Sequence, residues 1–198
     1  MEDLVDQMLA AMDQNLSAYY DTMEAKNIDV NEALTLASLI EKEGATDKDR
    51  KDIASVFYNR LNQDMPLQSN IAILYAQGQL GKKTTLKEDA TIDTNIDSPY
   101  NIYKNTGLMP GPVDSPGVSA IEAAVNPSKT DYLYFVTNVN GVNSYSKTFE
   151  EHDKNAKNYH KERDAKEKAD QEKSSATDKT GTGSSTDEKT STSSDKSK

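Results

Sequence analysis

The order of two hydrophobic patterns along the chain restricts its fold more than any other feature of the sequence. Apolar residues recur at helical spacing in three early segments, residues 2–25, 31–43 and 46–61. An alternating segment appears only late, in "DYLYFVTNVNGVNSYS" (residues 131–146), and Asn140-Gly141 at its centre predicts a β-hairpin. Because strands and helices do not alternate along the chain, the sequence predicts an α+β fold that is mainly helical.

Turn and capping residues predict where several helices begin and end. Gly44 fits a left-handed stop after the second helix. Thr46 with Asp49 fits the start of the third helix, and Pro116 suits the start of a later one. Thr148 is the expected cap of the last helix, which follows the hairpin.

Composition limits the size of the core and excludes several classes of function. The 198 residues are 34% hydrophobic, which is enough for one modest core. The absence of cysteine excludes disulfide and zinc–thiolate frameworks and argues against a redox role. A net charge of −10 would repel phosphate backbones, so no nucleic acid partner is expected.

The two ends of the sequence differ from its middle. Residues 1–30 are interpreted as a helical lead-in, the end of a truncated upstream segment, because no apolar run or signal pattern for membrane targeting is present. The folded part is expected over residues 31–160. Residues 161–198 are expected to extend the last helix and then become disordered from about residue 172, because 14 of the last 25 residues are Ser or Thr.

Few side chains in the sequence could carry catalysis. His152 and His160 are the only histidines, and their position on a polar helix indicates exposure rather than a metal site or a Ser-His triad. No phosphate loop or dinucleotide fingerprint is present, so neither a metal nor an organic cofactor is expected. Carboxylates remain as the plausible acid–base groups.

The segment "LASLIEKEG" (residues 36–44) contains two glutamates that helical geometry distinguishes. Leu36, Leu39 and Ile40 define an apolar stripe, and Glu43 falls within roughly 20° of its centre, whereas Glu41 lies about 140° away. Burial and the negative end of the helix dipole would both raise the pKa of Glu43, as a general acid requires. Spacing alone leaves open the alternative of a partly buried, hydrogen-bonded helix end. Glu41 is better placed to pair with a basic residue or to accept a bond from a backbone amide.

A long loop, "SPYNIYKNTGLMPGPVDSPG" (residues 98–117), is the second candidate for function. It is rich in proline, glycine and polar side chains, and loops of this length in compact domains tend to be functional. The alternative is a rigid loop that serves stability. Polar side chains here and in the segment before the short helix at residues 71–77 could line a cleft, namely Gln68, Asn70, Tyr100, Asn101, Tyr103 and Asn105.

Six segments, taken together and in order, resemble the endolytic murein transglycosylases of the MltG (YceG-like) family. They cover roughly residues 30–160 and read "LASLIEKEG", "DRKDIASVFYNRL", "MPLQSNIAILYAQG", "SPYNIYKNTGLMPGPVDSPG", "AIEAAVNPSKTDYLYFV" and "SYSKTFEEHDKN". The family often has Asp where this chain has Asn70, and its transmembrane helix and most of its LysM-like segment have no counterpart here.

This resemblance implies a lysozyme-like catalytic domain over residues 31–160 that acts at the extracytoplasmic face of the bacterial cell membrane. Its substrate would be nascent peptidoglycan strands, cut between N-acetylmuramic acid and N-acetylglucosamine to leave 1,6-anhydro ends. The family's catalytic glutamate falls on Glu43, which would act first as acid and then as base. Glu41 would support it or serve as the alternative acid.

Substrate binding is expected from Gln68, Asn70, Asn101 and Tyr103. Cell-wall synthesis proteins are possible partners, and contact with the membrane would require an anchor that lies outside this sequence. A function of another class stays open at this point, namely a non-catalytic module that binds peptidoglycan or serves as a scaffold for cell-wall synthesis. In that module the loop aromatics would matter and Glu43 would not.

Overall fold

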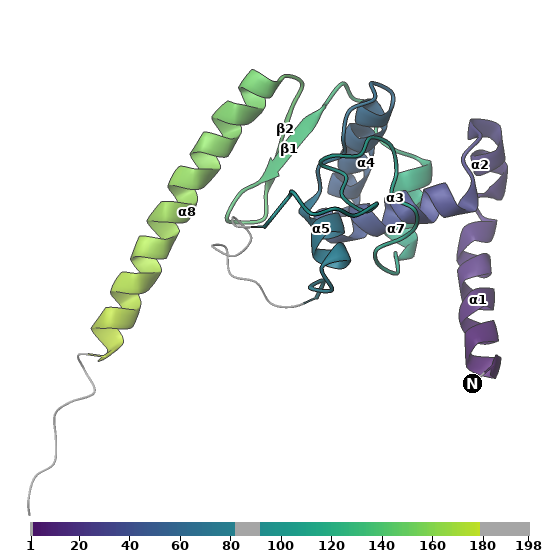
Figure 1. The fold of residues 1–198 in the computed structure, drawn as a ribbon, viewed down its shortest axis with the longest axis horizontal. Coiled ribbons are helices and arrows are strands. Elements are labelled where there is room, and N and C mark those ends of the chain that lie inside the picture. Colours follow the sequence, from purple (N-terminus) through teal and green to yellow (C-terminus); the bar gives the residue numbers. More distant parts are fainter. Residues whose placement is uncertain (1, 82–91, 179–198) are drawn as a thin grey trace, which may run out of the picture.

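The computed structural model describes residues 2–81 and 92–178 (Figure 1). In chain order its elements are α1 (Glu2–Ser17), α2 (Tyr20–Lys26), α3 (Val30–Glu43), α4 (Asp47–Leu61), α5 (Asn70–Ala76), α7 (Val118–Val125), β1 (Tyr134–Thr137), β2 (Asn143–Ser146) and α8 (Phe149–Asp178). The predicted mainly helical α+β fold with a late hairpin is confirmed. In this part of the chain, no helix combines the length and the hydropathy that crossing a membrane requires.

Helices α3, α4 and α7 pack together and form the body of the fold (Figure 1). Helices α3 and α7 are in contact, and each has small residues that are completely buried, which are Ala33 and Ala37 of α3 and Ala120, Ala123 and Ala124 of α7. Small side chains allow two helices to approach closely, and Leu36, Leu39, Ile53 and Phe57 fill the remaining core. The apolar stripe of α3 therefore faces the interior, as its spacing predicts.

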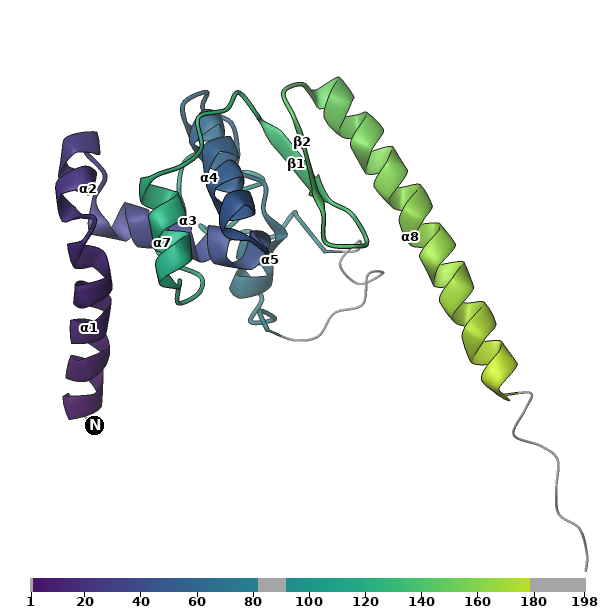
Figure 2. The ribbon, with the colours of Figure 1, turned by 180° about the vertical axis from the view of Figure 1, so that it is seen from behind.

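The hairpin and α8 extend from one side of this body, as Figures 1 and 2 show from opposite directions. β1 and β2 pair antiparallel, with Tyr134 opposite Ser146 and Thr137 opposite Asn143. Phe135 fixes the hairpin to α4 through an edge-to-face contact with Phe57, with ring centroids 6.2 Å apart. Helix α8 packs on the hairpin and continues to Asp178, past the residue near which the sequence predicts disorder. The rest of the predicted disordered tail lies outside the described residues.

The first helical segment is divided, although its apolar spacing predicts one helix over residues 2–25. The break falls at residues 18 and 19, between α1 and α2. Leu16 lies in the main core, whereas Met23 lies in a second cluster with Ala33 and Val125. Each of the two helices is therefore fixed by its own contact with the body of the fold. Helical periodicity alone does not predict that the helix breaks between these contacts.

Side-chain caps begin α3, α4 and α8. Asp29 and Glu32 form a reciprocal capping box at α3. Thr46 accepts a bond from the Asp49 amide, and Thr148 accepts one from the Glu151 amide, which confirms both predicted starts. Pro116 precedes the first helical residue of α7 by two positions, because Gly117 occupies the cap.

The prediction of a left-handed Gly44 is wrong. Its φ and ψ are −97° and 118°, which any residue can adopt. Glycine is needed here for a different reason, because a Cβ atom would lie 2.5 Å from Cγ and 3.0 Å from Cα of Arg50. The chain thus passes directly against α4 as soon as α3 ends.

Gly44→Ala is therefore expected to lower the free energy of unfolding by about 1–3 kcal/mol, the usual range for overpacking. Chemical denaturation measures the change. Gly111→Ala is the matched control, since its Cβ would meet no atom closer than 3.8 Å and its φ is not positive. Equal effects of the two substitutions would contradict the steric explanation.

Candidate active site

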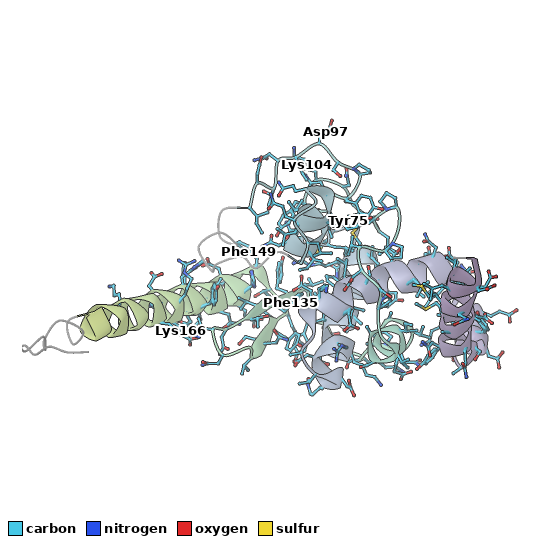
Figure 3. The ribbon with its side chains drawn as sticks, turned by 90° about the horizontal axis from the view of Figure 1, so that it is seen from below. Tyr75, Asp97, Lys104, Phe135, Phe149 and Lys166 are labelled. Atoms are coloured by element: carbon cyan, nitrogen blue, oxygen red, sulfur yellow. The ribbon has the colours of Figure 1, made fainter. Side chains whose placement is uncertain are left out.

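A pocket of about 520 Å³ lies between the body of the fold and β1. Its described lining residues come from the ends of α3 and α4, the segment that enters α5, α5 itself, residue 92, the long loop, β1 and α8. They are Glu43, Arg60, Leu67, Gln68, Asn70, Ile71, Leu74, Ile92, Tyr103, Phe135, Val136, Thr137 and His152. Figure 3 labels Phe135 in the hairpin, between α8 and the helical body.

Glu43, the last residue of α3, reaches this pocket from the buried face of the helix. Its Oε1 accepts a hydrogen bond of 2.8 Å from the hydroxyl of Ser69, the residue that caps α5. Burial raises the pKa of Glu43, and the bond from Ser69 opposes this shift only in part. The carboxyl group therefore retains a proton at higher pH than an exposed glutamate, and that proton is available in the pocket.

Glu41 faces a different part of the molecule and does not line the pocket. Its Oε2 accepts a bond of 3.0 Å from the Gly117 amide at the start of α7, and its Oε1 lies 3.6 Å from Nη2 of Arg50. These are the two kinds of contact that its position on α3 predicts, a backbone amide and a basic side chain. Glu41 thus ties the end of α3 to α4 and α7.

Gln68 is held at the pocket by both its backbone and its side chain. Its φ is 57°, an uncommon value for a residue other than glycine, and its amide donates to the Ile102 carbonyl at 3.0 Å. Its Oε1 accepts a bond of 3.1 Å from Nη1 of Arg60. Because a guanidinium only donates, this contact fixes the orientation of the Gln68 amide and leaves Nε2 as a donor at the pocket wall.

Arg60 is 6% exposed and connects three segments that form the pocket. It donates to the carbonyl groups of Leu133 at 2.6 Å, Pro66 at 2.9 Å and Leu67 at 3.1 Å, besides the bond to Gln68. The sequence reasoning missed this residue. A signal was available, because Arg60 follows Ile53, Val56 and Phe57 on the apolar stripe of α4, as Glu43 does on α3.

Tyr103 and Asn70 meet in the pocket. The Tyr103 hydroxyl donates to Oδ1 of Asn70 at 2.6 Å. Burial and the nearby Glu43 charge raise the pKa of Tyr103, so the phenol stays neutral. The two residues form a polar wall beside the acid.

Asn101 does not reach the pocket, although the sequence suggests it as a binding residue. It is 1% exposed, and its Nδ2 donates to the carbonyls of Thr94 at 3.1 Å and Ile96 at 2.7 Å. Its Oδ1 accepts a bond from the Tyr103 amide at 3.1 Å. The described contacts of this side chain thus lie within the loop, where they position Tyr103.

His152 is also placed differently from the sequence expectation. It is half-buried, lines the pocket and stacks on Tyr134, whereas His160 is exposed as expected. Burial and the Arg60 charge lower the pKa of His152, which keeps the imidazole neutral near neutral pH. Across residues 2–81 and 92–178, no group of three or more His, Cys, Asp or Glu side chains is arranged to hold a metal ion.

The chain is similar to proteins of one family. The profile of the YceG-like family matches residues 1–158. The endolytic murein transglycosylase of Streptococcus pneumoniae serotype 2 (strain D39) is 65% identical over 156 residues, which are 78% of this chain and 28% of that protein. The endolytic murein transglycosylase of Bacillus subtilis (strain 168) is 45% identical over 159 residues, which are 80% of this chain and 43% of that protein.

A solved structure agrees with these sequence matches. The 2.6 Å crystal structure of a yceG-like protein from Listeria monocytogenes superposes with a TM-score of 0.69 at 48% identity. That match covers 77% of this chain and 48% of the solved one. The chain thus spans less than half the length of these relatives, and the profile match covers most of its own residues. It belongs to the YceG-like family.

Proposed function

We propose that this chain carries the catalytic part of an endolytic lytic transglycosylase that cleaves peptidoglycan glycan strands. The observation that carries the proposal is Glu43, whose pKa is raised by burial and which is the sole carboxylic acid among the described residues that line the pocket. Glycosidases that attack with water need a second placed carboxylate, whereas a lytic transglycosylase needs one group that serves as acid and base. The names of the two relatives support the same reaction.

In the proposed mechanism, protonated Glu43 gives its proton to the oxygen that bridges N-acetylmuramic acid and N-acetylglucosamine. The bond from that oxygen to C1 of the muramic acid breaks, and the sugar passes through an oxocarbenium-like state that its own N-acetyl group stabilises. The Glu43 carboxylate then takes the proton of the sugar's 6-hydroxyl as that oxygen bonds to C1. The product is a 1,6-anhydro ring, and the proton on Glu43 is restored.

The pocket offers donors that suit the substrate. Nε2 of Gln68 is oriented by Arg60, and the polar pair of Asn70 and Tyr103 stands on α5 and the long loop. Acetamido and hydroxyl groups on the glycan have oxygens that accept such bonds. We assign Gln68 to a carbonyl oxygen of an N-acetyl group and the pair to sugar hydroxyls.

Gln68→Met and Gln68→Glu are both expected to lower kcat/KM about tenfold, the effect of losing one hydrogen bond of about 1.4 kcal/mol. The Glu variant still offers an acceptor to Arg60 but has no donor for the substrate. Steady-state kinetics on purified glycan strands measures the loss. Gln63→Glu adds the same charge at an exposed residue outside the pocket lining and should leave the kinetics unchanged. Wild-type kinetics in Gln68→Met would show that Nε2 is not used.

The size of the products tests the endolytic reaction. Incubation with uncrosslinked strands, followed by size-exclusion chromatography, should yield fragments of intermediate length. Release of disaccharides alone would contradict an internal cut. Intact strands that bind the chain would instead support the rival function, a non-catalytic glycan-binding or scaffold module.

The proposed substrate lies outside the cytoplasm, so we also propose that the protein acts at the extracytoplasmic face of the membrane.

A further inference from the structure

Three aromatic side chains form a cluster where the hairpin meets the start of α8. Tyr134 of β1 stacks on His152 of α8, with ring centroids 5.2 Å apart and ring planes at 22°. Phe149, the first residue of α8, meets Tyr134 edge-on at 6.0 Å and His152 at 6.3 Å. Phe149 is 67% exposed, although phenylalanine is among the residue types that are most often buried.

This cluster is continuous with the pocket that contains Glu43. His152 belongs to both, because it lines the pocket and stacks on Tyr134. The guanidinium of Arg60, another lining residue, lies 5.0 Å from the centre of the Tyr134 ring on its face. Figure 3 labels Phe149 at the start of α8 and Phe135 in the hairpin. A chain-like ligand that leaves the pocket past His152 would therefore meet Phe149.

We propose that Tyr134, Phe149 and His152 form a further subsite, which stacks a sugar ring of the glycan strand beyond the pocket. The proposal rests on the proposed function, because an internal cut requires the strand to continue past the scissile bond. A pyranose ring presents a face of C–H bonds that packs on an aromatic ring, and its hydroxyls remain in water at the rim. The ring of Tyr134 and the neutral imidazole of His152 both contact the ring of Phe149, so the exposed ring is held in position before a ligand binds.

Binding of strands to the full chain tests the subsite separately from cleavage. The Glu43→Gln chain serves as the background, and isothermal titration calorimetry with purified uncrosslinked strands gives Kd. Adding Phe149→Ala is expected to raise Kd about three- to tenfold, as the loss of one aromatic contact does. Phe149→Trp should keep the Kd of the background, because a larger ring still stacks.

Tyr20→Ala in the same background is the matched control, since Tyr20 is an exposed aromatic residue of α2 outside the pocket lining, and Kd should not change. With the free disaccharide of the glycan, Phe149→Ala should also leave Kd unchanged, because a short ligand in the pocket does not reach the subsite. An unchanged Kd for strands in Phe149→Ala, or no binding of strands by the background chain, would overturn the subsite. Failure of the wild-type chain to cleave strands would instead overturn the proposed function, whatever Phe149 does to Kd.

Discussion

Glu43→Gln is expected to reduce cleavage of glycan strands by about 10²–10⁴-fold, the usual contribution of a general acid–base group. Glutamine keeps the shape of the side chain and an oxygen that can accept the bond from Ser69, but it has no proton to give to the glycosidic oxygen. Chromatography of the products measures the loss. Because only the chemical step changes, Kd for intact strands should stay close to that of the wild-type chain.

Glu41→Gln is the control within the same helix. It keeps an acceptor for the Gly117 amide and loses only a partly exposed pairing with Arg50, so the rate should stay within about threefold of wild type. Equal losses in the two variants would transfer the catalytic assignment away from Glu43 alone.

The pH dependence of stability checks the environment of Glu43 independently of activity. Its pKa is higher in the folded than in the unfolded chain, so the stability that its proton contributes is lost as pH rises through the folded value. Glutamine does not titrate. The Glu43→Gln chain should therefore lose less stability than wild type between acidic and neutral pH, and chemical denaturation at several pH values measures this difference.

Arg60→Met is expected to lower the free energy of unfolding by about 3 kcal/mol. It removes the donor to the carbonyls of Leu133, Pro66 and Leu67, and each buried carbonyl left without a partner costs about 1–3 kcal/mol. Methionine fills much of the vacated space, so the lost hydrogen bonds rather than a cavity would account for the change. Thermal or urea denaturation measures it.

Lys157→Met is the control for removing a positive charge. Lys157 pairs with Asp153 on the exposed surface of α8, and such pairs contribute less than about 1 kcal/mol. A comparable loss in both variants would indicate that net charge matters, and would contradict a role of Arg60 in joining the segments around the pocket.

Local patterns in the sequence are sufficient to predict α3, α4, the hairpin and the difference in position between the two glutamates, but not the break between α1 and α2. Helical geometry places Glu43 on the buried stripe and Glu41 away from it, because both share one regular helix with Leu36, Leu39 and Ile40. The caps at Thr46 and Thr148 are equally local, since each bond spans three residues. These parts of the fold and of the site depend on near neighbours in the chain.

The remaining parts depend on contacts between distant segments. Gly44 is required by the approach of Arg50, not by its own backbone angles. Asn101 is polar and lies in a loop whose composition suggests function, but its side-chain amide donates to the backbone carbonyls of Thr94 and Ile96 instead of facing the pocket. His152 reaches the pocket because the hairpin places the start of α8 beside it. Sequence periodicity contains no information on contacts between distant segments. It therefore predicts the buried position of Glu43, but it does not predict which other residues line the pocket.

The most direct test of the account is the isotope content of the product ends formed by the wild-type chain in water labelled with oxygen-18. The proposed reaction closes the ring with the sugar's own 6-hydroxyl, so mass spectrometry should find 1,6-anhydromuramyl ends that contain no heavy oxygen. New reducing ends in place of anhydromuramyl ends would show that water attacks the sugar, and would contradict a mechanism in which Glu43 alone serves as acid and base.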